Sequence, residues 1–131
     1  MKIAILGAGR VGRAIALDLA GRYEVSSFDK DALALQRLRD EAPSIATFQV
    51  NLQQWDRYAE WLKGFDLLVT AVPGFMGFRT LEAAIRCGLP VADISFFPED
   101  ALELDELALR VGVTVITDIG VAPGMSNLIL G

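Results

Sequence analysis

The sequence predicts an α/β fold, a doubly wound parallel sheet of six strands with helices on both faces. Two observations lead to this prediction. Short apolar runs alternate with stretches of helical period along the chain, which is typical of parallel strands joined by crossover helices. The first apolar run, residues 2–6, is followed at once by "GAGRVG" (7–12). A glycine-rich first turn makes the Rossmann-type strand order 3-2-1-4-5-6 the expected one.

Three strand–helix units account for the first half of the chain. Residues 2–6 are apolar on both faces, as a central parallel strand must be. Over 10–21 the apolar residues recur with helical period, and Gly21 ends that helix. The next elements are a strand at 24–28, a helix at 31–41 followed by Pro43, a strand at 45–50, and a helix whose apolar face is formed by Trp55, Tyr58, Ala59 and Leu62.

The second half repeats this alternation. "DLLVTAV" (66–72) is the most apolar strand and stops at Pro73. The remaining elements are a helix from about 78 to 87 that ends at Gly88, a strand at 90–94, a helix from Pro98 to about 110 with Glu99 and Asp100 at its positive end, and a sixth strand at 113–117.

The sequence predicts one complete domain and the start of another. Residues 1–119 form the Rossmann-type domain. The segment 120–131, which contains "VAPGMSNLILG", resembles a turn followed by the start of another helix. We interpret it as the junction to a second domain that is absent from this sequence. The alternative is a natural tail that packs on the sheet.

Composition excludes several classes of partner and site. The net charge is −5 and there is no Lys/Arg run, so no nucleic-acid partner is expected. No apolar run reaches the ~18 residues of a membrane span. The single cysteine, Cys87, fits a reducing cytoplasm. With one cysteine and no histidine, no metal site is expected.

The glycine turn has the spacing of a dinucleotide-binding motif, with a strand before it and a helix after it. Gly7 would allow the tight turn, Gly9 the close approach of a pyrophosphate, and Gly12 the packing of the helix on the strand. Arg10 and Val11 open the helix, whose first amides would face the phosphates with the positive end of the dipole.

Asp29 ends the second strand at about the spacing expected for the acidic residue that binds the adenosine ribose. At ~4 Å and an effective dielectric of ~20, each charge pair with a 2′-phosphate would cost about 4 kcal/mol before screening. This favours NAD over NADP, whereas Lys30 leaves NADP possible because it could turn toward a phosphate. The simpler role for Asp29 is to cap the following helix, which Asp31 could do instead.

Other candidate residues follow the remaining strands, where ligands of such sheets lie. Asn51 and Leu52 would flank adenine, and the segment Ala71, Val72 and Pro73 would pass near the nicotinamide ribose. Asp93 and Ser95 follow strand five, and Asp118 follows strand six. Each also has a simpler role, as a strand stop, a loop cap or a turn former.

Three segments together resemble the saccharopine dehydrogenase family, and the L-lysine dehydrogenase-like branch is the most similar. They are "GAGRVG", "TAVPGFMGFRTLEAAIRCGLPVADISFF" and "GVTVITDIGVAPGMSN". The resemblance implies a nicotinamide-binding domain followed by a second domain that dimerises and supplies most of the amino-acid substrate pocket. It also implies hydride transfer at a C–N bond. The chain departs from the family at Asn51, where an acidic residue is frequent, and at Ser95-Phe96, where Ser-Tyr is frequent.

The sequence leaves the catalytic acid or base unidentified. Asp93 and Asp118 are weak candidates, and so are Cys87, which also suits a core position, and the lysines. Lys63 also suits a helix C-terminus. The chain alone is expected to bind NAD without turning over substrate. Two other functions stay open, a regulatory nucleotide sensor of a potassium channel or transporter and a flavodoxin-like sheet without a dinucleotide.

Overall fold

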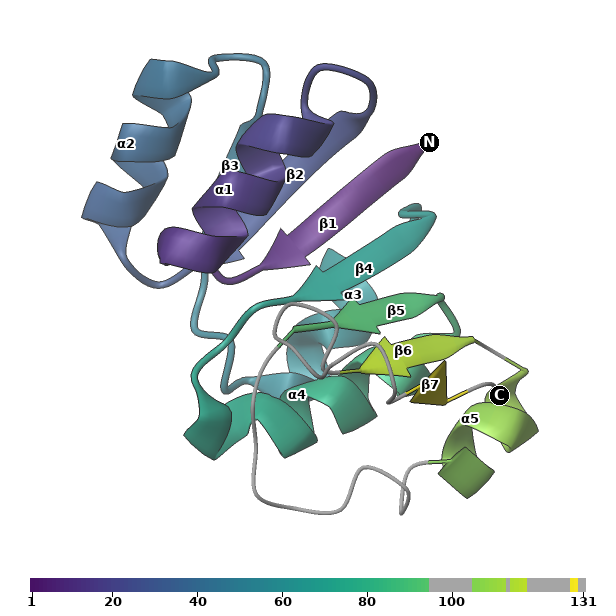
Figure 1. The fold of residues 1–131 in the computed structure, drawn as a ribbon. Helices are drawn as coiled ribbons and strands as arrows, with labels where there is room; N and C mark the ends of the chain where they lie inside the picture. Colours follow the sequence, from purple (N-terminus) through teal and green to yellow (C-terminus); the bar gives the residue numbers. More distant parts are fainter. Residues whose placement is uncertain (95–104, 113, 118–127, 130–131) are drawn as a thin grey trace.

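Four consecutive buried apolar side chains make Lys2–Leu6 (β1) the central strand of the sheet. It pairs in parallel with Glu24–Asp29 (β2) on one side and Leu67–Thr70 (β4) on the other. A computed structural model gives this arrangement for residues 1–94, 105–112, 114–117 and 128–129 (Figure 1). The predictions that concern Ser95, Phe96, Asp118 and the start of a helix at Pro98 lie outside these residues.

The sheet has the order β3-β2-β1-β4-β5-β6-β7. Its first six strands therefore confirm the predicted Rossmann-type order. The remaining strands are Ala46–Gln49 (β3), Val91–Asp93 (β5), Val115–Thr117 (β6) and Leu128–Ile129 (β7).

The seventh strand corrects the prediction for the end of the sequence. Leu128–Ile129 pairs antiparallel with β6, in the register Val115↔Ile129 and Ile116↔Leu128. The segment "LIL" had been expected to start a helix. A short apolar run fits either state, and the open edge of β6 supplies backbone partners that favour the strand.

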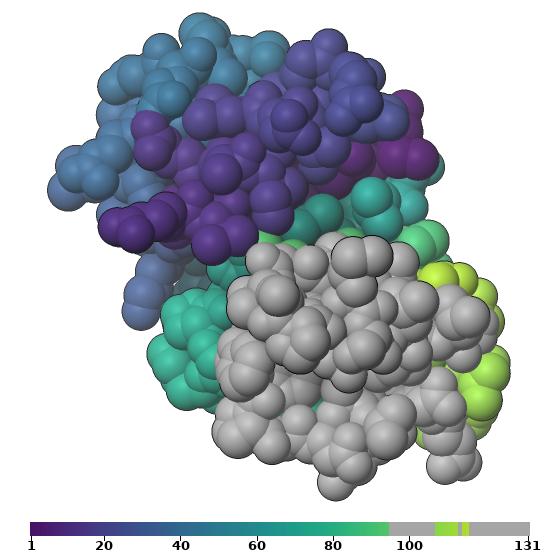
Figure 2. Space-filling model, in the orientation of Figure 1, coloured from purple at the N-terminus to yellow at the C-terminus, as the bar shows by residue number. Residues whose placement is uncertain are grey.

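Helices cover both faces of the sheet, as predicted (Figure 1). Arg10–Leu19 (α1) and Ala32–Glu41 (α2) pack on one face. The other face carries the 3₁₀ helix Trp55–Arg57 (η1) and the helices Tyr58–Trp61 (α3), Gly74–Arg86 (α4) and Asp105–Val111 (α5). In Figure 2 the N-terminal part of the chain, which includes α1 and α2, is purple and blue and lies above the teal surface at the lower left.

Two helices differ from the sequence prediction in their extent. The third is a 3₁₀ turn followed by a single α-turn rather than one continuous helix. The fourth begins at Gly74, directly after Pro73, and not near residue 78. Proline is well suited to the first positions of a helix, where its missing N–H has no partner to lose.

The core is divided between the two faces by the alternation of side chains along β1. Ile3 and Ile5 pack with Ala16 and Leu38 of the α1–α2 layer. Ala4 and Leu6 pack in the cluster on the opposite face. All four side chains of β1 are at most 1% exposed, so the strand belongs to both halves of the core.

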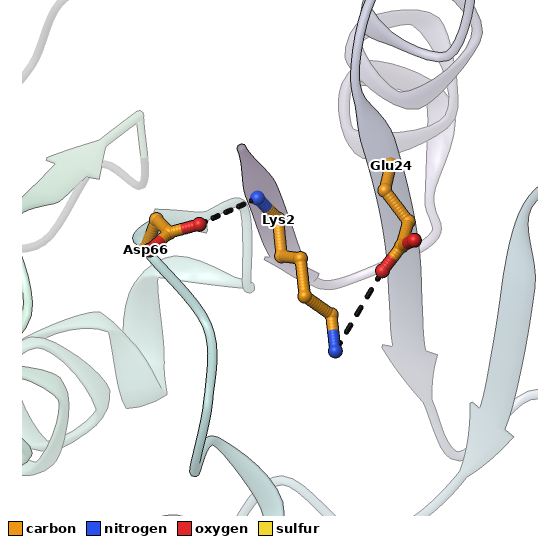
Figure 3. Close-up of polar contacts among 3 residues, drawn as sticks. All are labelled: Lys2, Glu24 and Asp66. Carbon is orange, nitrogen blue, oxygen red and sulfur yellow. Dashed lines mark hydrogen bonds and ion pairs between the residues drawn. The ribbon is translucent and has the colours of Figure 1, made fainter.

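The amino edge of the sheet is fastened by polar contacts around Lys2 (Figure 3). Its backbone N–H donates to the Asp66 carboxylate at 2.8 Å, and its Nζ lies 3.6 Å from the Glu24 carboxylate. These residues are largely exposed, so the ion pair contributes little stability. These contacts align the starts of β1, β2 and β4. The opposite, carboxyl edge of the sheet stays free of them and is open to a ligand.

Candidate functional site

A cleft of about 470 Å³ lies at the carboxyl edge of the sheet. It is placed between β1 and β4, where the strand order reverses, and open α/β sheets bind ligands at this point. All the residues predicted to bind a cofactor line it except Gly12. They are Gly7, Gly9, Arg10, Val11, Asp29, Lys30, Asn51, Leu52, Ala71, Val72 and Pro73.

Gly7 and Gly12 fit one another and the end of β4 so closely that a side chain would not fit at either position. Gly7 has a φ of 112°, and a Cβ there would lie 2.3 Å from the carbonyl oxygen of Ala71. A Cβ at Gly12 would lie 2.1 Å from the carbonyl oxygen of Gly7. These glycines therefore build the turn and the helix–strand contact.

Gly9 has a different surrounding, because no described atom outside Gly9 and its two chain neighbours lies within 4 Å of the position of its Cβ. This space opens toward the first turn of α1, which contains no acidic residue and which no described side chain caps. In α2, by contrast, the Asp31 carboxylate caps the first amides. The first amides of α1 and the positive end of its dipole are thus suited to an anion such as a pyrophosphate.

Asp29 is half-buried at the end of β2, and both of its carboxylate oxygens accept backbone hydrogen bonds. Oδ2 accepts from the Ala8 N–H at 2.6 Å, and Oδ1 accepts from the Asp31 N–H at 2.9 Å. The cap of α2 is Asp31, which accepts from Leu33 and Ala34. The alternative role of Asp29 as the cap of that helix is therefore wrong, and Asp29 is one of the residues that line the cleft.

The adenine side of the cleft is a short loop held from behind. The Asn51 side chain accepts from the Gln53 N–H at 2.9 Å, and the Tyr58 hydroxyl donates to the carbonyl oxygen of Leu52 at 2.6 Å. Tyr58 is 1% exposed, and its burial raises its pKa to about 12. The hydroxyl therefore stays protonated at neutral pH and keeps its hydrogen bond to the loop.

Sequence reasoning missed three residues that line the cleft, namely Gln53, Phe75 and Met76. Phe75 is 74% exposed and Met76 is 8% exposed. Both belong to the first turn of α4, which lies before the predicted start of that helix near residue 78. The preference of proline for helix starts is the signal that would have found them. For Gln53 the signal is Asn51, since asparagine often accepts from the N–H two residues on.

Of the candidate acid–base groups in the described residues, Lys30 lines the cleft, whereas Asp93, Cys87 and Lys63 do not. Asp93 is fully buried at the end of β5 and accepts a hydrogen bond from the Thr70 hydroxyl at 2.5 Å. Cys87 lines a separate cavity behind α4, and burial raises the pKa of its thiol, which disfavours the reactive thiolate. Lys63 is exposed beside Gly64. Ser95 and Asp118 lie outside the described residues.

Comparison with known proteins shows which family the chain belongs to. Residues 3–116 match the family model described as the saccharopine dehydrogenase NADP binding domain. The chain belongs to this family. It is a nicotinamide-dinucleotide-binding domain of the kind found in saccharopine dehydrogenase-like oxidoreductases.

Among the described residues, no helix combines the length and apolar character that a membrane crossing needs.

Two saccharopine dehydrogenases that this chain resembles are much longer than the chain. Saccharopine dehydrogenase [NADP(+), L-glutamate-forming] of Pyricularia oryzae is 32% identical over 63 residues, which are 48% of this chain and 14% of that protein. Apo saccharopine dehydrogenase (L-Glu forming) of Saccharomyces cerevisiae superposes with a TM-score of 0.81 at 21% identity, over 95% of this chain and 28% of that one.

A second similar structure was solved with a nicotinamide cofactor. It is the WlbA (WbpB) dehydrogenase of Thermus thermophilus in complex with NAD and alpha-ketoglutarate. Its TM-score is 0.64 at 23% identity, over 89% of this chain and 40% of that one. This likeness shows the shared fold.

The family match and the fold also bear on the alternative functions. The family match favours the oxidoreductase over the sensor of a potassium channel or transporter, for which no support emerges. The observed strand order, with β1 between β2 and β4, excludes the flavodoxin-like arrangement, in which the third strand neighbours the first.

Proposed function

We propose that this chain is the NAD(H)-binding domain of a larger oxidoreductase that transfers a hydride at a C–N bond of an amino-acid substrate. The glycine turn and Asp29, which meet in one cleft, are the observation that carries the proposal. The bound nicotinamide would supply the hydride chemistry, and the protein would position it. The substrate class is taken from the names of the saccharopine dehydrogenases that the chain resembles.

Each side of the cleft has a proposed task. The backbone at Gly9 and the first amides of α1 hold the pyrophosphate, and Asp29 holds the adenosine ribose. Asn51 and Leu52 border the adenine. Ala71, Val72 and Pro73 border the nicotinamide ribose. The relatives are much longer than this chain, and we assign the substrate pocket, the acid–base group and the contacts of a homodimer mainly to a second domain.

We further propose that NAD is preferred over NADP, as Asp29 indicates. A 2′-phosphate would lie beside this carboxylate at an estimated cost of about 4 kcal/mol per charge pair before screening. Lys30 also lines the cleft and would offset part of this cost. The family model and the Pyricularia relative carry NADP in their descriptions, so the preference for NAD rests on Asp29 alone.

A thermal-shift titration with NAD, NADH, NADP and NADPH tests both proposals. A ligand at a hundred times its Kd stabilises the folded chain by about 2.7 kcal/mol, which raises the Tm of a domain of this size by roughly 10 °C. We expect this shift with NAD(H), a smaller one with NADP(H), and a weakened NAD(H) shift in Asp29→Ala.

Two outcomes would overturn these proposals separately. A larger shift with NADP(H) would show that Lys30 outweighs Asp29, whereas no shift with any of the four would remove the dinucleotide site itself. The same samples test the division of labour between the domains. We expect no NADH production from lysine or saccharopine by this chain, and steady turnover would show that its own residues suffice.

A further inference from the structure

We infer that Asp29 is also a positioning residue, which shapes the glycine turn before a ligand arrives. This inference rests on the proposed function and adds to the ribose contact assigned to Asp29. The carboxylate joins two segments that are 21 residues apart in the sequence, through the 2.6 Å hydrogen bond from Ala8 in the turn. It also holds the start of α2 through the N–H of Asp31.

The Ala8 amide needs this partner because the residue is buried. Ala8 is 2% exposed, so without the carboxylate its N–H would be a donor cut off from water. An unsatisfied buried donor is costly, and hydrogen bonds to charged acceptors are stronger than neutral ones. The preceding amide, that of Gly7, donates to the carbonyl oxygen of Phe28 at 2.8 Å. Two successive amides of the turn are thus fastened to the end of β2.

This fastening leaves the following amides for the ligand. With Gly7 and Ala8 bonded to β2, the chain turns so that Gly9, Arg10 and Val11 line the cleft. If the bond from Ala8 were lost, the turn could relax toward water and the first amides of α1 would no longer converge. Asp29 would thereby act on the pyrophosphate through the backbone, without touching it.

Removal of the Asp29 carboxylate should therefore have two opposite effects on the binding of an anion. The loss of a negative charge beside the site would strengthen binding by simple electrostatics. The loss of the hydrogen bond from Ala8 would weaken it. The sign of the change shows which effect dominates, and a ribose contact alone predicts no weakening for a ligand without a ribose.

Inorganic pyrophosphate is such a ligand, and its Kd can be measured from the amide NMR shifts of Gly9, Arg10 and Val11. We expect Asp29→Ala to weaken pyrophosphate binding on the order of tenfold. Asp31→Ala is the matched control, since it removes the same charge two residues away and leaves the Ala8 bond intact. It should bind pyrophosphate as well as the unchanged chain or slightly better. Equal or tighter binding by Asp29→Ala would overturn the inference.

A second measurement needs no substitution and stays informative if Asp29→Ala fails to fold. In the unchanged chain without ligand, the Ala8 amide should exchange its hydrogen at least about a hundredfold more slowly than the Gly9 amide. Equal exchange at the two positions would also overturn the inference. If the unchanged chain bound neither NAD nor pyrophosphate while Ala8 remained protected, the proposed function would fail and the positioning of the turn would stand.

Discussion

At the scale of single residues, the three glycines of the turn have different surroundings. Gly7 and Gly12 are fixed by contacts within the protein, because a Cβ at either position would lie closer than 2.5 Å to a backbone oxygen. Gly9 faces open space, so its lack of a side chain matters only to whatever enters the cleft. The fold therefore requires glycine at positions 7 and 12, whereas a ligand requires it at position 9.

Substitution by alanine should separate these requirements. Gly12→Ala is expected to lower the free energy of unfolding by about 2 kcal/mol or more, because the strain of overpacking exceeds the gain of about 1 kcal/mol from helix propensity. Gly9→Ala should cost less than about 1 kcal/mol but weaken NAD binding on the order of tenfold, since the methyl group would stand between the backbone and the pyrophosphate.

Urea unfolding and a binding titration on both variants provide the measurement. Gly9→Ala serves as the stability control for Gly12→Ala, because both changes add one methyl group to the same turn. If Gly9→Ala bound NAD as tightly as the unchanged chain, the pyrophosphate would have to lie elsewhere in the cleft.

At the scale of elements, the loop on the adenine side depends on one buried hydrogen bond. Tyr58→Phe removes the hydroxyl that donates to Leu52 and should lower the free energy of unfolding by about 1–3 kcal/mol, because the buried carbonyl loses its partner. NAD affinity should fall as well, since Leu52 lines the cleft. Thr47→Val is a suitable control, because it also removes one hydroxyl that takes part in a hydrogen bond, the one from Arg39 to Thr47, and neither residue lines the cleft.

Tyr58 also gives stability a defined dependence on alkaline pH. Burial raises its pKa from 10.0 to about 12, so the folded chain retains the proton longer than the unfolded chain does. The stabilisation is complete below pH 10 and is lost as the pH rises toward 12. Urea unfolding across this interval should show a steeper loss of stability for the unchanged chain than for Tyr58→Phe. Parallel pH profiles would contradict the assignment.

The sequence predicted most elements because their signals were local. The apolar strands and the helical period of the first helix can both be recognised from residues that are close in sequence. The start of α4 was placed too late because Pro73 was interpreted only as the stop of the preceding strand, although it directly precedes the helix. The state of Leu128–Ile129 was wrong because it depends on pairing with β6, which no local pattern contains.

At the scale of the whole molecule, the cleft was predictable because it depends on topology. Once the glycine turn indicates the strand order, the carboxyl ends of β1, β2 and β4 must meet at one edge. Two of the three unpredicted members, Phe75 and Met76, depend on where a helix begins, so one misplaced boundary removed both. Among the acid–base candidates in the part of the chain that the structure describes, Lys30 lines the cleft, whereas Asp93, Cys87 and Lys63 do not.

The two layers should unfold together because β1 contributes to both. Ile5 is fully buried against the α1–α2 layer, whereas Trp55 and Trp61 pack on the other face. Ile5→Ala should lower the free energy of unfolding by about 2–5 kcal/mol. The midpoint of the urea transition should fall equally by tryptophan fluorescence and by circular dichroism. A fluorescence midpoint that stays in place would show that the two layers unfold independently.

The contacts around Lys2 have a practical consequence for any surface-based assay. Met1 is 67% exposed and precedes β1 at the amino edge, which the Lys2 contacts hold together (Figure 3). Five residues of strand separate that edge from the glycine turn, a span of roughly 16 Å. A tether at the N-terminus would therefore immobilise the chain with its cleft directed away from the support, free to exchange nucleotides with the flowing solution.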